Sequence, residues 1–277
     1  MIDLHTHSTA SDGTLSPTQL VEAAAAAGVT TLALTDHDCV AGVEEAALAA
    51  ARCGIRLVPG IELSVSWRGQ TLHLVGLNLD IHNSALQQAT EQVLDMRRSR
   101  AAEIARKLEQ SGVHAPLEGA RKHAQTELIS RTHFAHYLVE QGHARDIRRV
   151  FKHYLVRGKP GFVSCEWLSL EHGVELVHRA GGLAVLAHPA RYTLSRTRMR
   201  ELMKVLQSLG VDAIEVVSGS HSQEENRAMA QLALDFNMPA SQGSDYHGPE
   251  KPWVQLGKLP PMYYRCTPLW EAGLNLD

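Results

Sequence analysis

Short apolar runs alternate with amphipathic segments along most of the chain. Seven of these runs have the length and composition of strands, at residues 2–7, 31–37, 56–65, 71–77, 183–188, 213–218 and 239–245. Apolar residues at helical spacing lie at 17–27, 40–52, 170–180, 198–209 and 224–236. Ser16 before Pro17 suits a capped start for the first of these helices. Strands that alternate with helices favour a parallel sheet, either doubly wound or closed into a barrel.

This alternation stops between Asn83 and Gly161. The segment "LDMRRSRAAEIARKLEQSG" places apolar residues on one helical face, and "RTHFAHYLVEQGHARDIRRVFKHYL" continues without strands. The segment is rich in arginine and lysine and ends in "VRGKPGF", a glycine and proline turn. We therefore predict a helical insertion at 83–161 within a barrel formed by 1–82 and 162–277.

Composition narrows the class of protein. The chain has 277 residues, is 44% hydrophobic and carries a formal net charge of -3, which argues against binding to duplex DNA. We expect a cytoplasmic enzyme, because we find neither a signal peptide nor a bilayer-spanning apolar run. Its four cysteines form no Cys-x-x-Cys pair, which indicates ordinary reduced thiols. Sixteen histidines against four phenylalanines are unusual, and histidine is the commonest nitrogen ligand of metals.

Candidate ligands begin in the first predicted strand. In "DLHTHSTASDG", a strand would point His5 and His7 to the same side, and Asp12 follows in a Ser-Asp-Gly turn. Imidazole nitrogens and a carboxylate oxygen suit zinc, manganese or iron, so these residues form a plausible half-site. Surface histidines at a strand end are the alternative at this point.

Further histidines and carboxylates lie at or just after the ends of other strand-like runs: His37, Glu62, His188, Asp245 and His247. The carboxyl-terminal end of the strands carries the chemistry of a barrel. His73 lies within an apolar run, where a hydrogen-bonded core histidine is the alternative to a ligand. Buried carboxylates need a partner, and metal ions would provide one.

The motifs "DLHTHSTASDGT", "LTDHD", "GIELS", "LHLVGL", "AHP" and "GSDYH" together resemble those of the PHP (polymerase and histidinol phosphatase) superfamily, in order and across nearly the whole chain. "SRTHFA" and "GKPGF" resemble the branch that holds nucleoside 3',5'-bisphosphate phosphatases and a related 5'-to-3' exoribonuclease, ribonuclease AM. The resemblance implies an α/β fold, a distorted (β/α)7 TIM-like barrel with a small helical insertion.

The resemblance also implies three divalent metal ions, with manganese expected first and iron or zinc as alternatives. His5, His7, Glu62 and Asp245 would hold the first ion; Glu62, as a bridge, with His73 and His188 would hold the second; and Asp12, His37 and His247 would hold the third. All nine positions carry suitable residues. This counts against a non-catalytic, metal-stabilised PHP module that docks on a protein partner, and no obligatory protein partner is evident.

The expected reaction is hydrolysis by a metal-held hydroxide, without a protein nucleophile. Asp36 and Asp38 would orient imidazole N–H groups, with acid catalysis as the alternative. His221 would donate a proton or contact phosphate, with an ordinary loop histidine as the alternative. The family positions of Arg131 and Lys159 imply contacts with substrate, and Arg191 is a further candidate whose alternative is a salt bridge at the rim. The expected substrates are nucleoside 3',5'-bisphosphates and short oligoribonucleotides, with histidinol phosphate or another small phosphomonoester as the alternative.

Overall fold

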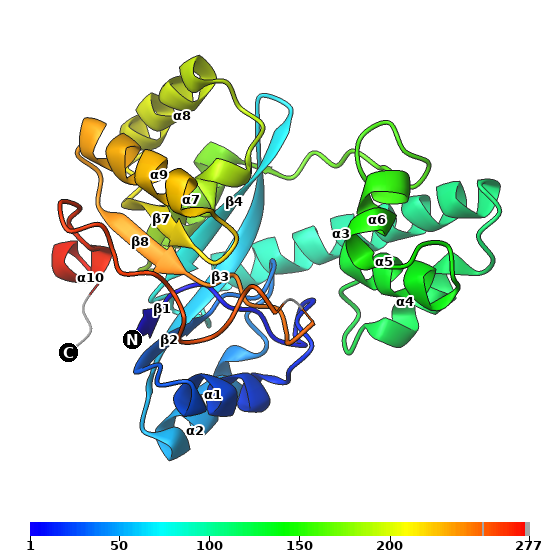
Figure 1. Ribbon diagram of the computed structural model, residues 1–277, viewed down its shortest axis with the longest axis horizontal. Helices are drawn as coiled ribbons and strands as arrows, with labels where there is room; N and C mark the ends of the chain where they lie inside the picture. The colour runs from blue at the N-terminus through cyan, green and yellow to red at the C-terminus, as the bar shows by residue number, and fades with distance from the viewer. Residues whose placement is uncertain (251, 275–277) are drawn as a thin grey trace.

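The computed structural model describes residues 1–250 and 252–274, and its centre is a nearly closed barrel (Figure 1). The strands follow the order β1 (Ile2–Asp3), β2 (Thr31–Leu34), β3 (Arg56–Trp67), β4 (Gln70–Leu77), β6 (Leu183–Leu186), β7 (Ala213–Ser218) and β8 (Ala240–Gly243), and the short β5 (Leu168–Ser169) pairs with β3. The first and last strands meet, because the Leu4 N–H donates to the Gln242 carbonyl at 3.1 Å. The expected distorted barrel is confirmed.

One strand departs from the predicted parallel sheet. β4 runs antiparallel to both of its neighbours, β3 and β6, whereas the other neighbouring pairs in the barrel order are parallel. The reason is local, because only Arg68 and Gly69 join β3 to β4 and both have positive φ, 47° and 74°. Two such residues form a tight hairpin turn, which leaves no room for a crossover helix.

Helices cover the outside of the barrel where the sequence predicts them, with ends shifted by at most three residues. They are α1 (Pro17–Ala26), α2 (Val43–Cys53), α7 (Leu170–Arg179), α8 (Arg196–Ser208) and α9 (Gln223–Asp235). Ser16 caps α1 as expected, since its side chain accepts the Gln19 N–H. Two further short helices were not predicted, η2 (Pro189–Arg191) and α10 (Leu269–Ala272).

Two apolar layers hold the barrel. Side chains such as Leu32, Leu63 and Leu202 form the outer layer between strands and helices. Smaller residues, including Ala33, Val58 and Ala213, pack inside the barrel together with Leu269 of α10. Their packing fills the barrel interior, so the polar side chains gather at one end of it. Within the described residues, no helix has both the length and the apolar character needed to cross a bilayer.

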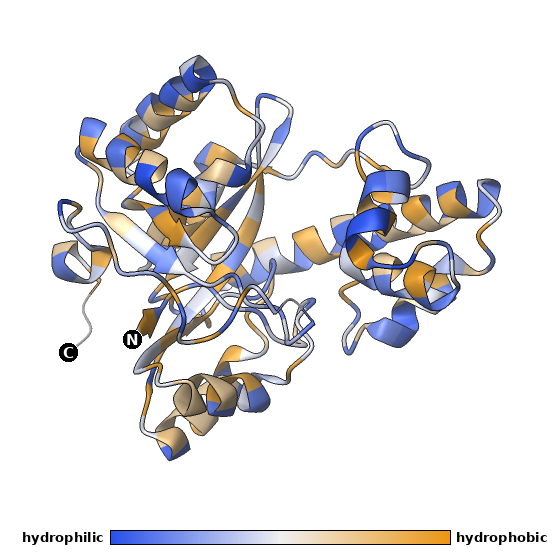
Figure 2. Ribbon diagram, in the orientation of Figure 1, coloured by the Kyte–Doolittle hydropathy of each residue, from blue (hydrophilic) through white to orange (hydrophobic). Residues whose placement is uncertain are grey.

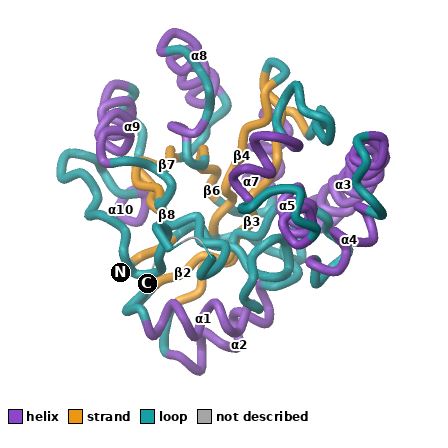
Figure 3. Tube along the Cα trace, turned by 45° about the vertical axis from the view of Figure 1, so that its right-hand side comes forward, coloured by secondary structure: helices purple, strands orange, loops and turns teal. Residues whose placement is uncertain are grey.

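The segment between β4 and β5 is helical and extends away from the barrel (Figures 1 and 3). It contains α3 (Ser84–Gln110), α4 (Pro116–His123), α5 (Arg131–Glu140), α6 (Ile147–Val150) and the π-helical turn η1 (Phe151–Leu155). Its own core includes Ile104, Leu108 and Phe134. Figure 2 shows hydrophobic residues alternating with hydrophilic ones along these helices. The start of α3 packs on the barrel core through Leu86 and Ala89, so the boundary predicted at 83 lies within barrel packing.

Candidate metal centre

His5 and His7 lie in the loop that follows β1, because the strand ends at Asp3 and not at residue 7 as the sequence predicted. Thr6 fixes this loop between two strands. Its N–H donates to the Thr35 hydroxyl at 3.1 Å, its own hydroxyl donates to the Ala33 carbonyl at 2.6 Å, and it forms a bridge with Tyr246. The two imidazoles are buried, with ring centroids 5.1 Å apart. The loop conformation, and not strand alternation, brings both rings to one side.

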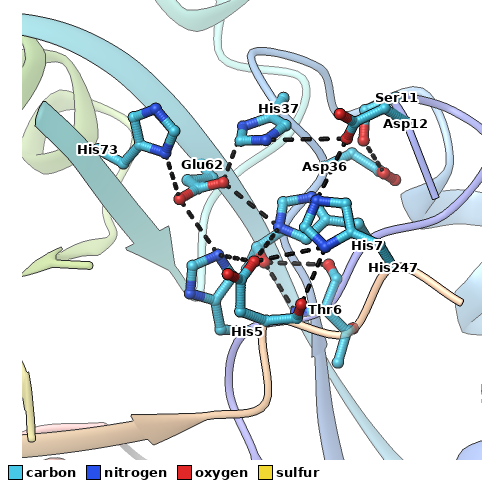
Figure 4. Close-up of polar contacts among 12 residues, drawn as sticks. His5, Thr6, His7, Ser11, Asp12, Asp36, His37, Glu62, His73 and His247 are labelled. Carbon is cyan, nitrogen blue, oxygen red and sulfur yellow. Dashed lines mark hydrogen bonds and ion pairs between the residues drawn. The ribbon is translucent and has the colours of Figure 1, made fainter. Parts of the chain in front are cut away.

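Glu62 lies at the centre of the cluster (Figure 4). It is fully buried in the middle of the long β3, not at a strand end as predicted. Its Oε1 lies 2.8 Å from His73 Nδ1 and 3.0 Å from His188 Nε2. Its Oε2 lies 2.8 Å from His37 Nδ1 and 3.3 Å from His7 Nε2. One carboxylate therefore faces imidazoles from several loops and strands, as a bridging ligand would.

Asp245 and Asp12 extend the cluster on the side of β8. Asp245 Oδ1 lies 3.3 Å from His7 Nε2. Asp12 Oδ1 lies 3.4 Å from His247 Nε2 and 3.8 Å from His37 Nε2. Figure 4 shows these rings pointing toward the same space as His7. The structure thus brings all nine predicted ligands into one site, in which His37, His73 and His247 are partly exposed and the other six are buried.

The donor set fits divalent metal ions. Four groups have ligand atoms within 4.8 Å of one another: His7, Asp12, His37 and His247; His5, His7 and Asp245; His5, Glu62 and His188; and His37, Glu62 and His73. Several buried atoms of these side chains have no hydrogen-bond partner among the described residues, including both nitrogens of His7, Asp12 Oδ1 and Glu62 Oε2. Unpaired polar atoms are costly in a protein interior. Bound cations would remove that cost.

Burial and the charges within the cluster give its imidazoles very different pKa values. Burial and the neighbouring His247 and His37 hold the pKa of His7 well below its usual range. Burial also lowers the pKa of His73, to about 4. At His37 the carboxylates of Glu62 and Asp12 outweigh burial and raise the pKa to about 9. The carboxylates of Glu62 and Asp12 therefore keep His37 protonated near pH 7, which shows how strongly they favour a positive charge beside them.

Sequence reasoning missed Glu215, a buried residue in the middle of β7. Its Oε1 lies 3.3 Å from His5 Nδ1, and its Oε2 accepts the backbone N–H of His188 at 2.5 Å. A carboxylate on the second ring nitrogen fixes the tautomer of a histidine ligand. Glu215 is the single charged residue in the run "AIEVVS", and this was the available signal.

Asp36 and Asp38 do not orient imidazoles as predicted. Asp36 accepts the backbone N–H and hydroxyl of Ser8, at 2.7 and 2.6 Å, and the Ser11 hydroxyl at 2.5 Å, so it shapes the loop before Asp12. Asp38 accepts the Ser64 N–H at 2.6 Å and pairs with Arg97 of α3. Their serine and arginine partners are close in space but far away in the sequence, so the sequence pattern could not predict these contacts.

The predicted substrate residues differ in their surroundings. Arg131 begins α5, is half-buried and lies over the Phe151 ring with its Cζ 5.7 Å from the centroid. Arg191 pairs with Asp245 at 2.7 Å and its side chain is 52% exposed, which matches the rim salt bridge that the sequence left open. Lys159 is exposed in the turn after η1. His221 lies 3.2 Å from the amide oxygen of Asn226, and burial lowers its pKa.

Arg100 of α3 was not singled out from the sequence. Its guanidinium lies over the Trp167 ring, with Cζ 5.3 Å from the centroid, and donates to the Val163 carbonyl. Burial, with Arg131 and Arg97 nearby, lowers its pKa to about 10. Among the described residues, neither Arg100 nor Arg131 forms an ion pair with a carboxylate. These two cations are therefore available to an anion.

A PHP domain matches residues 3–209 of the chain. The chain belongs to the PHP domain family. It is 45% identical to a 3',5'-nucleoside bisphosphate phosphatase of Chromobacterium violaceum, over 98% of this chain and 95% of that protein. It is 41% identical to the 5'-3' exoribonuclease Rnm of Escherichia coli K12, over 99% of this chain and 94% of that protein. Within the PHP family, the chain is thus an enzyme of the class that hydrolyses phosphoric ester bonds.

Two solved structures of PHP-type proteins have the same fold. An amidohydrolase from Chromobacterium violaceum, with bound sulfate and no metal, superimposes with a TM-score of 0.94 at 44% identity and covers 98% of this chain and 95% of that one. A metal-dependent phosphoesterase from Bifidobacterium adolescentis gives a TM-score of 0.81 at 25% identity and covers 96% of this chain and 92% of that one. The helical segment is included in both alignments, since their coverage exceeds the barrel.

Proposed function

We propose that this enzyme uses a cluster of three divalent ions, manganese first among them, to hydrolyse the 3'-phosphate of nucleoside 3',5'-bisphosphates. The observation that carries the proposal is the position of Arg100 and Arg131, which have no carboxylate partner among the described residues, on the helical segment that packs against the candidate metal centre. The named bisphosphate phosphatase relative supports the same substrate class. A substrate with two phosphates would bind one of them at the metal ions and the other at Arg100 and Arg131.

His5, His7, Glu62 and Asp245 would hold one ion, Glu62 with His73 and His188 a second, and Asp12, His37 and His247 a third. Such ions supply a hydroxide nucleophile at neutral pH and neutralise the charge on the phosphoryl oxygens. The buried carboxylates and the imidazoles around them would hold these ions and so fix where the reacting phosphate binds. Glu215 holds the ring of His5 and the backbone of His188 in place for that purpose.

The second phosphate, on the 5' side of the nucleotide, would bind Arg131 and Arg100. A guanidinium presents a planar fork that matches phosphate oxygens, and charge-assisted hydrogen bonds are about twice as strong as neutral ones. Lys159 would add a contact from its exposed turn. His221 would contact phosphate or donate a proton to the leaving oxygen, as the sequence predicts. Because burial lowers its pKa, His221 is neutral near pH 7, so proton donation would require the ring to take up a proton from solvent first.

The same site would accept short oligoribonucleotides with a 5'-phosphate. Relatives named 5'-3' exoribonuclease are 40% and 41% identical to this chain over nearly its full length. A 3'-phosphodiester differs from a 3'-phosphomonoester only in the leaving group. Histidinol phosphate is disfavoured, because it has one phosphate and would leave the arginines unpaired.

The test compares phosphate release from a nucleoside 3',5'-bisphosphate with release from the corresponding 3'-monophosphate. We expect kcat/KM to be about tenfold to a hundredfold higher for the bisphosphate, because one or two charge-assisted hydrogen bonds to its second phosphate would stabilise the transition state by that factor. Chromatography should identify the 5'-monophosphate as the product. Equal values for both substrates, or release of the 5'-phosphate, would contradict the proposal. Chelation followed by assay without metal should abolish turnover, and adding manganese should restore it.

A further inference from the structure

The helical segment contacts the barrel at loops that carry proposed ligands. The Ser130 hydroxyl donates to Asp12 Oδ2 at 3.0 Å across 118 residues of sequence. Thr126 donates to the Ala10 carbonyl at 3.4 Å, in the same loop as Asp12. Arg97 of α3 pairs with Asp38, next to His37. These contacts place the helical segment directly against the outer side of the metal cluster.

Ser130 has a second task, as the residue that caps α5. Its hydroxyl oxygen accepts the Thr132 N–H at 3.0 Å, and its backbone N–H donates to His133 Nδ1 at 3.0 Å. A hydroxyl has one proton, and the proton of Ser130 is directed at Asp12 while its oxygen faces the helix. Ser130 is buried, at 8% exposure, so water does not compete readily for these bonds. The start of α5 and the carboxylate of Asp12 are therefore held by one side chain.

The bond also determines which way the carboxylate faces. Asp12 Oδ2 is occupied by Ser130, whereas Oδ1 faces His247 and His37 and has no hydrogen-bond partner among the described residues. Rotation of the carboxylate would break the bond to Ser130. The oxygen left for a cation is thus the one nearest the two imidazoles that belong to the same group.

We propose that Ser130 is a positioning residue for the ion at Asp12, His37 and His247, and that binding of this ion and docking of α5 stabilise each other. The inference rests on the proposed metal centre. Its consequence concerns selectivity, because Arg131 is the first residue of α5. An enzyme without this ion would hold Arg131 less firmly beside the site.

The first test measures metal per chain by elemental analysis after dialysis against a series of buffered Mn²⁺ concentrations. Ser130→Gly removes the hydroxyl but leaves a residue that caps helices nearly as well. We expect affinity for one of the ions to fall by about tenfold to a hundredfold, the usual effect of removing a partner of a ligand. Thr132→Ala, which keeps the backbone N–H that Ser130 caps, should bind metal like the wild type. Ser130→Thr should restore binding.

A wild-type isotherm in Ser130→Gly would overturn the role of Ser130. Failure of the proposed metal centre would look different, because wild type and Asp12→Ala would then bind the same amount of Mn²⁺.

The reciprocal test measures amide hydrogen exchange in residues 131–140 with and without Mn²⁺, since coupling between two sites acts in both directions. In the wild type, Mn²⁺ should slow exchange in α5. In Ser130→Gly the same addition should have a markedly smaller effect on α5 and an unchanged effect on β3, which carries Glu62. Equal slowing of α5 in both proteins would overturn the coupling. Neither readout depends on turnover.

Discussion

Glu215 Oε1 lies 3.3 Å from His5 Nδ1, and the two residues are 210 positions apart in the sequence. Both side chains are buried, and Glu215 also holds the backbone N–H of His188. The carboxylate of β7 therefore fixes the ring of one proposed ligand and the main chain of another.

Glu215→Gln should lower metal affinity by about tenfold to a hundredfold while the fold is retained, because an amide of the same size keeps the packing but lacks the charge that sets the His5 tautomer. Titration with Mn²⁺ followed by elemental analysis measures the loss. Glu225→Gln provides the control, because Glu225 is an exposed capping residue of α9. An unchanged affinity in Glu215→Gln would assign Glu215 to structure alone.

Glu62→Gln should have a larger effect, since Glu62 faces imidazoles on both of its oxygens. We expect the loss of at least two bound ions and of most phosphate release, because a neutral amide cannot bridge cations as a carboxylate does. Metal content and turnover should be measured on the same sample. Full metal content with normal turnover would remove Glu62 from the bridging role.

Arg131→Ala should reduce kcat/KM for a nucleoside 3',5'-bisphosphate by about tenfold to a hundredfold, with much less effect on an aryl phosphate. The reason is that the aryl phosphate has no second phosphate for the guanidinium to bind. Arg145→Ala is the matched control, because Arg145 is an exposed arginine of the same helical segment and pairs with Asp146. Equal losses on both substrates would indicate a role for Arg131 in structure or in metal binding.

His133 predicts a pH dependence of stability. The ring is buried and its Nδ1 accepts the Ser130 N–H, and burial lowers its pKa from 6.5 to about 4. Between these values the unfolded chain binds a proton that the folded chain excludes, so stability falls as the pH drops from 6.5 toward 4. At pH 5 the loss from this group is about 2 kcal/mol.

His133→Gln keeps an acceptor at the same position of the capping box but does not titrate. In urea unfolding of metal-free protein, the gap in unfolding free energy between wild type and variant should shift by about 2 kcal/mol in favour of the variant between pH 7.5 and pH 5. A pH-independent gap would show that the ring of His133 takes up its proton in the folded protein.

The sequence by itself determined the alternation of strands and helices, which is compatible with a doubly wound sheet or a barrel, and the resemblance of its motifs to the PHP superfamily favoured the barrel. It also contained all nine proposed ligands, and their places in motifs that resemble those of the PHP superfamily set them apart from the other histidines and carboxylates of the chain. His5, Glu62 and His247 were all visible in this way. The helical character of the segment after Asn83 was equally readable from the spacing of apolar residues.

Only the tertiary structure decided which side chains support those ligands. Glu215 meets His5 and Ser130 meets Asp12 across more than a hundred residues, and no local spacing encodes such contacts. The direction of β4 depended on two residues with positive φ in a tight turn, which outweighed the general preference for parallel strands. Arg100 became a candidate because its neighbours in space are arginines and Trp167, not carboxylates. The periodicity of apolar residues shows which face of a helix or strand a residue occupies. Which residues that face contacts depends on how segments far apart in the sequence pack together.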